Sequence, residues 1–130
     1  MKKHGKKFRF LKTYGNLAEV LTDRKLASLG DAFINFVYSL VLSNKKGQPS
    51  GAKVKGRVLA EALRKAGLRK YMPSRITRHM LADAAEGLAV YAWLHHYVTL
   101  EESVAMLEKT EDLVEGLSQW LLTIKGRIRF

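Results

Sequence analysis

The stretch Leu26–Val41, LASLGDAFINFVYSLV, is the main indication of the fold. Its apolar residues recur every three or four positions, which is the spacing of one face of an α-helix: Leu26, Leu29, Phe33, Phe36, Val37 and Leu40. We expect this whole face, Leu29 and Phe36 included, to pack into a core. Asp31 interrupts the apolar run, and a carboxylate seldom lies in such a helix unless it is paired or binds a metal.

A second apolar stretch, Met80–Leu94, carries two further acids within MLADAAEGLAVYAWL. Asp83 and Glu86 are three residues apart, so they share one side of the predicted helix. Three acids in two apolar helices indicate a site where carboxylates gather. The alternative is a purely structural role, in which each acid pairs with a Lys or Arg of a neighbouring helix.

Length and composition set limits on the class of protein. A chain of 130 residues with 47% hydrophobic content is expected to form one domain, 1–130, with a core of its own. The absence of cysteine excludes disulfides, thiolate metal sites and cysteine nucleophiles. No window approaches the roughly 18 apolar residues of a membrane span, and the basic N-terminus does not resemble a signal peptide. We therefore expect a cytoplasmic protein with no membrane partner.

The charge of the chain points to a polyanionic partner. The net charge is +11, which favours nucleic acid first and an anionic membrane surface second. Residues 1–12 form a basic arm with two phenylalanines, which either stack on bases or dock on the core. Residues 45–70 carry nine Lys or Arg and one acid. The candidate phosphate contacts there, for which a solvated rim is the alternative, are Lys45, Lys46, Lys53, Lys55 and Arg57.

The local signals predict helices throughout and no strand, so the fold class is all-α. Helix starts are expected from N-cap residues at Asn16, Asp23 and Thr99, the last with Glu102 in a capping box. The predicted helices cover Tyr14–Leu21, Leu26–Leu42, Lys53–Lys65 with Gly67 as C-cap, Pro73 to about His96, and Thr99 to about Lys125 as one helix or a kinked pair. Residues 43–51 are predicted to be a loop.

Three segments resemble the ribonuclease III family in the same order along the chain. Leu26–Ala32, LASLGDA, is similar to the signature Leu-Glu-Phe-Leu-Gly-Asp-Ala/Ser. Ser50–Leu68 looks like the middle helix of that family, and Leu81–Leu88, LADAAEGL, looks like its second acidic motif. The resemblance spans about Leu17 to Leu94. It implies a ribonuclease III endonuclease-domain-like helical bundle, usually a homodimer, that cleaves double-stranded or structured RNA in RNA processing with Mg²⁺ or Mn²⁺.

The resemblance also assigns roles to residues. Asp31, Asp83 and Glu86 fall on three of the four active-site acids of the family, which implies that they are catalytic and bind the metal. The fourth acid, four residues before Asp31, is replaced by Ala27, and Arg24 stands where a further acid is frequent. Each missing carboxylate removes a ligand and a negative charge that favours the metal.

The short Mini-III relatives, which also lack a separate RNA-binding domain, resemble this chain in having a small residue at the position of Ala27. They carry an acid four residues after the signature Asp, where this chain has Asn35, a weaker neutral oxygen ligand. Ser28 replaces the bulky residue of the family's dimer contact. Two functions of this fold therefore remain open: an RNA endonuclease, or a non-catalytic RNA-binding or ribonucleoprotein-structural descendant that has lost one acid.

Overall fold

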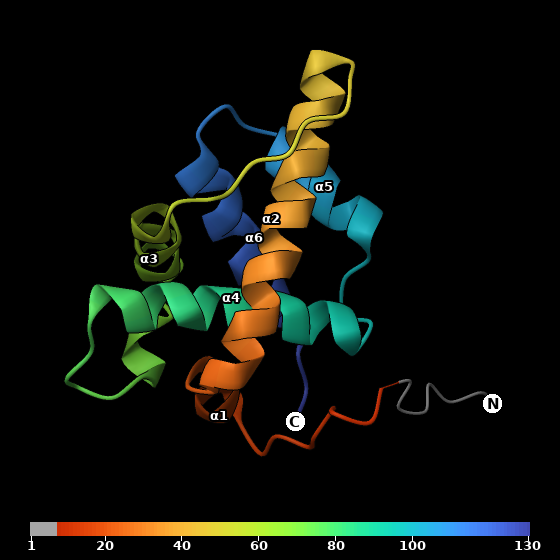
Figure 1. The fold of residues 1–130 in the computed structure, drawn as a ribbon. Helices are drawn as coiled ribbons and strands as arrows, with labels where there is room; N and C mark the ends of the chain where they lie inside the picture. The colour runs from red at the N-terminus through yellow and green to blue at the C-terminus, as the bar shows by residue number, and fades with distance from the viewer. Residues whose placement is uncertain (1–7) are drawn as a thin grey trace.

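Six α-helices and one 3₁₀ turn form the described part of the chain, residues 8–130 of a computed structural model (Figure 1). The elements are α1 (Leu17–Leu21), α2 (Arg24–Lys46), α3 (Gly56–Lys65), the 3₁₀ turn η1 (Arg69–Tyr71), α4 (Arg78–Leu94), α5 (Leu100–Glu108) and α6 (Leu113–Arg127). No strand occurs within residues 8–130, which confirms the all-α prediction. Residues 1–7 of the predicted basic arm lie outside the described residues.

The crossing of α2 over α4 is the centre of the fold, as Figure 1 shows. Gly30 of α2 faces the backbone of α4, and a Cβ at this position would overlap the carbonyl of Glu86 and lie 3.0 Å from its Cα. Gly87 of α4 faces the backbone of Ala27, with 3.6 Å between a hypothetical Cβ and the Ala27 nitrogen. A Cβ at Gly87 would make ordinary contacts, so the missing side chain of Gly30 is what lets the helix axes approach closely and the acidic segments of α2 and α4 meet.

A single hydrophobic cluster joins the helices around this crossing. Trp120 of α6 is fully buried in this cluster. The inward position predicted for two residues of α2 is wrong: Leu29 is 40% exposed and Phe36 is 53% exposed. The reason is that α2 has more apolar residues than one buried face accommodates, so a second apolar stripe faces outward.

Because α2 is apolar on two sides, the expectation that no segment reaches the length of a membrane span is wrong. An 18-residue window of Arg24–Lys46 has a mean hydropathy of 1.5 and, by length and composition, is apolar enough to cross a membrane. In the structure 39% of that window is buried. A core helix of a soluble protein meets the same criteria, so α2 by itself does not indicate a membrane segment.

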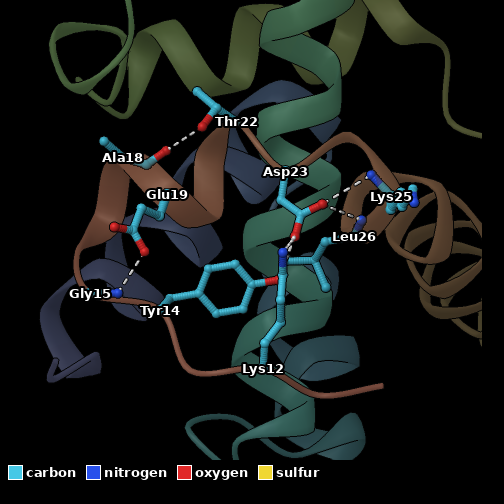
Figure 2. A network of polar contacts seen from close by, with 9 residues as sticks. All are labelled: Lys12, Tyr14, Gly15, Ala18, Glu19, Thr22, Asp23, Lys25 and Leu26. Atoms are coloured by element: carbon cyan, nitrogen blue, oxygen red, sulfur yellow. Dashed lines mark hydrogen bonds and ion pairs between the residues drawn. The ribbon is translucent and has the colours of Figure 1, made fainter. Parts of the chain in front are cut away.

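A polar network fastens the N-terminal segment to the start of α2 (Figure 2). Asp23 accepts hydrogen bonds from the backbone N–H groups of Lys25 and Leu26, each at 3.1 Å, which confirms it as the N-cap. The hydroxyl of Tyr14 donates to Asp23 at 2.6 Å, and the ammonium of Lys12 lies 3.7 Å from the same carboxylate. The N-terminus of α2, and with it the turn that leads to Asp31, is thereby held in place.

Several predicted helix boundaries differ from the structure. α2 continues past Leu42 to Lys46, where Gly47 with a φ of 74° ends it. α3 begins at Gly56, because residues 53–55 are extended. α4 begins after Thr77, whose hydroxyl accepts the N–H of Met80 at 3.1 Å, and it ends at Leu94.

The remaining N-cap predictions are confirmed, whereas the predicted C-cap Gly67 lies one residue beyond the C-cap of α3, which is Ala66. Asn16 caps α1, although this helix starts at Leu17 and not at Tyr14. Thr99 and Glu102 form the capping box of α5. The predicted final segment is two helices, because Asp112 caps α6 separately. Gly67, with a φ of 76°, follows the end of α3.

Candidate functional site

The three acids predicted as site residues line one open pocket. Asp31 reaches it from α2, whereas Asp83 and Glu86 reach it from α4 at the helix crossing. The remaining lining residues belong to the first part of α2: Arg24, Lys25, Ala27 and Ser28. The side chains that the sequence placed on two distant helices are therefore neighbours in the fold, and their chemical role stays a prediction.

Glu86 has the most perturbed environment in this pocket. Its side chain is buried at 9% exposure and is hydrogen-bonded to Asp31. Burial, that hydrogen bond, and the negative charges of Asp31 and Asp83 raise the pKa of Glu86 to about 8, against the opposing charge of Lys53. At neutral pH Glu86 is therefore mainly protonated, and its side chain is hydrogen-bonded to that of Asp31.

Asn35 lies one helical turn after Asp31 and contacts it directly. The Asn35 side-chain nitrogen donates to a carboxylate oxygen of Asp31 at 3.1 Å. The side-chain oxygen of Asn35 accepts the backbone N–H of Val54 at 2.8 Å. The residue that the sequence offered as a weak metal ligand thus bridges Asp31 and the chain before α3.

The predicted phosphate contacts fall into two groups. Lys53 and Lys55 flank Val54 and are exposed, and Arg57 follows in the first turn of α3. Lys53 is near enough to the acids for its charge to act on Glu86. Lys53 and Lys55 lie on the segment that Asn35 connects to Asp31, and Arg57 is two residues further along the chain.

The other two predicted contacts lie at the far end of α2. Lys45 is 14 residues after Asp31, which is about 21 Å along a helix that rises 1.5 Å per residue. Its ammonium is 3.8 Å from Glu111, and Lys46 donates to the hydroxyl of Ser50 at 3.2 Å. The fold therefore does not bring Lys45 and Lys46 to the acids.

Two cations of the pocket were missed as site residues. Arg24 was noted only as the replacement of an acid, and Lys25 was not considered, yet both line the pocket with Asp31. A signal was present in the sequence, because residues seven positions apart on a helix share a face. Arg24 and Asp31 have this spacing.

Asp31, Asp83 and Glu86 offer only carboxylate oxygens to a divalent cation. No group of three or more His, Cys, Asp or Glu side chains is arranged to hold a metal ion within residues 8–130. Mg²⁺, however, is commonly bound through one or two carboxylates, while water and substrate phosphates complete its octahedral shell. The all-oxygen donor set of Asp31, Asp83 and Glu86 fits this open type of site rather than a closed protein cage.

Comparison with protein-family models identifies the family of this chain. A family model described as Ribonuclease III matches residues 24–123, which include α2 to α5, most of α6 and all three acids. No curated protein matches the chain. The all-helical architecture agrees with the helical endonuclease domain of that family.

Proposed function

Because the chain belongs to the ribonuclease III family, we propose that it is a metal-dependent endonuclease that acts on double-stranded or structured RNA. The observation that carries this proposal is the pocket in which Asp31, Asp83 and Glu86 meet from two helices. The net charge of +11 supports a polyanionic substrate.

In this proposal Asp31, Asp83 and Glu86 would supply the carboxylates for Mg²⁺ or Mn²⁺, with water and substrate phosphates completing the shell of the cation. The bound cation supplies water activation and neutralisation of charge on the scissile phosphate. Asp31 is oriented for this role by the N–H of Asn35. Glu86 must first release its proton, so its carboxylate becomes available as the site gains positive charge.

Cations on both sides of the pocket would bind the RNA backbone. Lys53 and Lys55 lie in the segment before α3, Arg57 lies in the first turn of α3, and Arg24 and Lys25 line the pocket itself. The deep major groove of A-form RNA is closed to side chains, so recognition would use phosphates, 2′-hydroxyls and helix shape. We expect little sequence preference.

We further propose a homodimer that forms through the exposed apolar stripe of α2. Leu29 and Phe36, seven residues apart, lie on one side of that helix. Trp93, 37% exposed, stacks on Phe33 with 5.1 Å between ring centroids and adds apolar surface at the C-terminal end of α4. An isologous contact would bury the same stripe on both copies.

The test is cleavage of long duplex RNA by the purified chain with Mg²⁺ or Mn²⁺. The matched control is Asp83→Asn, because it keeps the side-chain size and removes the charge. We expect cleavage by the wild-type chain, none in EDTA, and a loss of at least about 100-fold in the variant. Intact duplex RNA under all metal conditions would contradict the proposal, as would equal cleavage by Asp83→Asn.

A second function, RNA binding without catalysis, is favoured by two observations at the same pocket. Ala27, 3% exposed, presents a methyl group at the pocket wall where the family has a Glu. The Asp31–Glu86 pair is already satisfied by the hydrogen bond between the two side chains. RNA affinity that is the same in EDTA and in Mg²⁺, and is unchanged in Asp83→Asn, would favour this function. Cleavage that appears only in Ala27→Glu would also show that the natural site has lost activity.

A further inference from the structure

Residues 50–55, which we name the strap, run along α2 outside any helix (Figure 1), and Lys55 at their end has an extended backbone. Three α2 side chains spaced four residues apart bind the strap backbone at positions spaced two residues apart. Ser43 accepts the N–H of Ser50 at 2.9 Å, Ser39 accepts the N–H of Ala52 at 2.9 Å, and Asn35 accepts the N–H of Val54 at 2.8 Å. The two serine hydroxyls also donate to the carbonyls of Ser50 and Ala52, at 3.1 and 3.2 Å.

We call these three side-chain contacts a ladder, in which each contact is one rung. Their spacing follows from the geometry of the helix and of the strap. Four residues of α-helix advance about 6 Å, and two residues of extended chain advance about 6.6 Å. The periods nearly coincide, so three successive hydrogen bonds form without distortion. Side chains of extended chain alternate, so Val54 is buried at 7% exposure while Lys53 and Lys55 project outward.

Asn35 differs from the two serines because it also contacts the acid pocket. Its nitrogen donates to Asp31 at 3.1 Å while its oxygen holds the backbone between Lys53 and Lys55. A single amide group therefore connects one acid of the site to the segment that carries two cations.

We propose that Asn35 is a positioning residue, whose amide fixes the spacing between the Asp31 carboxylate and the strap cations Lys53 and Lys55. The inference rests on the proposed function, because the spacing matters for an RNA whose phosphates contact the cations while the acids act on its backbone. The Asn35 oxygen, which accepts the Val54 N–H, is thereby assigned to the strap and not to a metal.

The first test is amide hydrogen exchange in three variants. Asn35→Ala should make the Val54 amide exchange about tenfold faster, because its acceptor is lost and the strap opens locally. Ser43→Ala is the matched control: it removes the rung at Ser50 and should leave the Val54 amide protected. Asn35→Asp keeps an oxygen for Val54 and should also retain protection there. Unchanged protection of Val54 in Asn35→Ala would overturn the inference.

The second test separates positioning from general stability through the kinetics of duplex RNA cleavage. Asn35→Ala should raise KM about threefold or more and lower kcat, whereas Ser43→Ala should keep both within about twofold at a similar unfolding midpoint. Asn35→Asp should return KM towards the wild-type value, because the strap is held again. Equal constants for Asn35→Ala and Ser43→Ala would refute the positioning role.

The two proposals fail in different ways. If the wild-type chain cleaves RNA and Asn35→Ala keeps both kinetic constants, only the positioning role is wrong. If the wild-type chain does not cleave RNA, the endonuclease proposal is wrong, and two other readouts decide the role of Asn35. These are the exchange of the Val54 amide and the affinity for a duplex RNA in EDTA, which should fall in Asn35→Ala and not in Ser43→Ala.

Discussion

Substitution of Gly30 by alanine tests whether the close crossing of α2 and α4 builds the site. The new methyl group would overlap the carbonyl of Glu86 and lie 3.0 Å from its Cα. These are backbone atoms of a buried helix, so no side-chain rotation relieves the contact. Ordinary carbon contacts need about 3.5 Å, so the helices must separate locally by roughly 1 Å or more.

The energetic cost follows from two opposing terms. Overpacking of a well-packed core costs about 1–3 kcal/mol, and contact with rigid backbone favours the upper end. Alanine returns about 1 kcal/mol through its better helix propensity. We therefore expect Gly30→Ala to lower the free energy of unfolding by about 2 kcal/mol, which corresponds to a Tm lower by roughly 6–12 °C for a chain of this size.

The measurement is urea denaturation followed by circular dichroism, with Gly126→Ala as the matched control. Gly126 also lies in a helix, but a Cβ there meets nothing within 4 Å. The control should be neutral or more stable by up to about 1 kcal/mol. If Gly30→Ala were as stable as the wild type, the crossing would not require glycine, and the reasoning that brings Asp31 next to Glu86 would fail.

Three further predictions concern the pocket, the strap and the dimer. Because the pKa of Glu86 is raised in the folded chain from 4.5 to about 8, its contribution to stability is fully present only below pH 4.5 and is lost as the pH rises from there to about 8. In EDTA, Glu86→Gln should therefore raise the Tm relative to wild type more at pH 9 than at pH 5, and parallel pH profiles would contradict this. Lys53→Ala should reduce the slope of log affinity against log salt for duplex RNA by roughly 0.7–0.9, measured by fluorescence anisotropy; an unchanged slope would mean that Lys53 contacts no phosphate. Phe36→Asp, which places a charge at a 53% exposed position, should turn a dimer into a monomer in sedimentation velocity without a change in helix content; a monomeric wild type would refute the proposed interface.

The parts of the fold that depend on neighbouring residues in sequence were predictable. Asn16, Asp23 and Thr99 each cap a helix as expected, because an N-cap needs only a side-chain oxygen and the N–H groups two or three residues later. The helical periodicity of Leu26–Val41 and Met80–Leu94 indicated an all-α fold. These signals are local, so no knowledge of the tertiary structure was needed.

The start of α3 could not be predicted in this way. Lys53–Lys65 has helical periodicity, yet the strap takes Lys53 out of the helix because its backbone binds α2 side chains 13 to 19 residues earlier. The exposure of Leu29 and Phe36 was missed for a related reason: periodicity shows that a face is apolar but not what covers it.

The acids of the pocket were predictable in identity but not in electrostatic state. Asp31, Asp83 and Glu86 stood out as carboxylates in apolar helices. The raised pKa of Glu86 depends first on its burial at the helix crossing. The role of Asn35 depends on the same tertiary contact, because its partner Val54 is 19 residues away in the sequence.

Because of the ladder between α2 and the strap, inserting or deleting one residue in the strap should have a different effect from inserting or deleting two. One residue added or removed between Ser50 and Val54 would turn the valine towards solvent and swing a lysine into the core, since neighbouring side chains of extended chain point in opposite directions. A change of two residues would restore the inward and outward pattern and lose only one rung. The turn at Gly47, which precedes the first rung, can vary in length without this constraint. We therefore expect the chain to tolerate insertions before residue 50, and to tolerate insertions between Ser50 and Val54 only when two residues are added together.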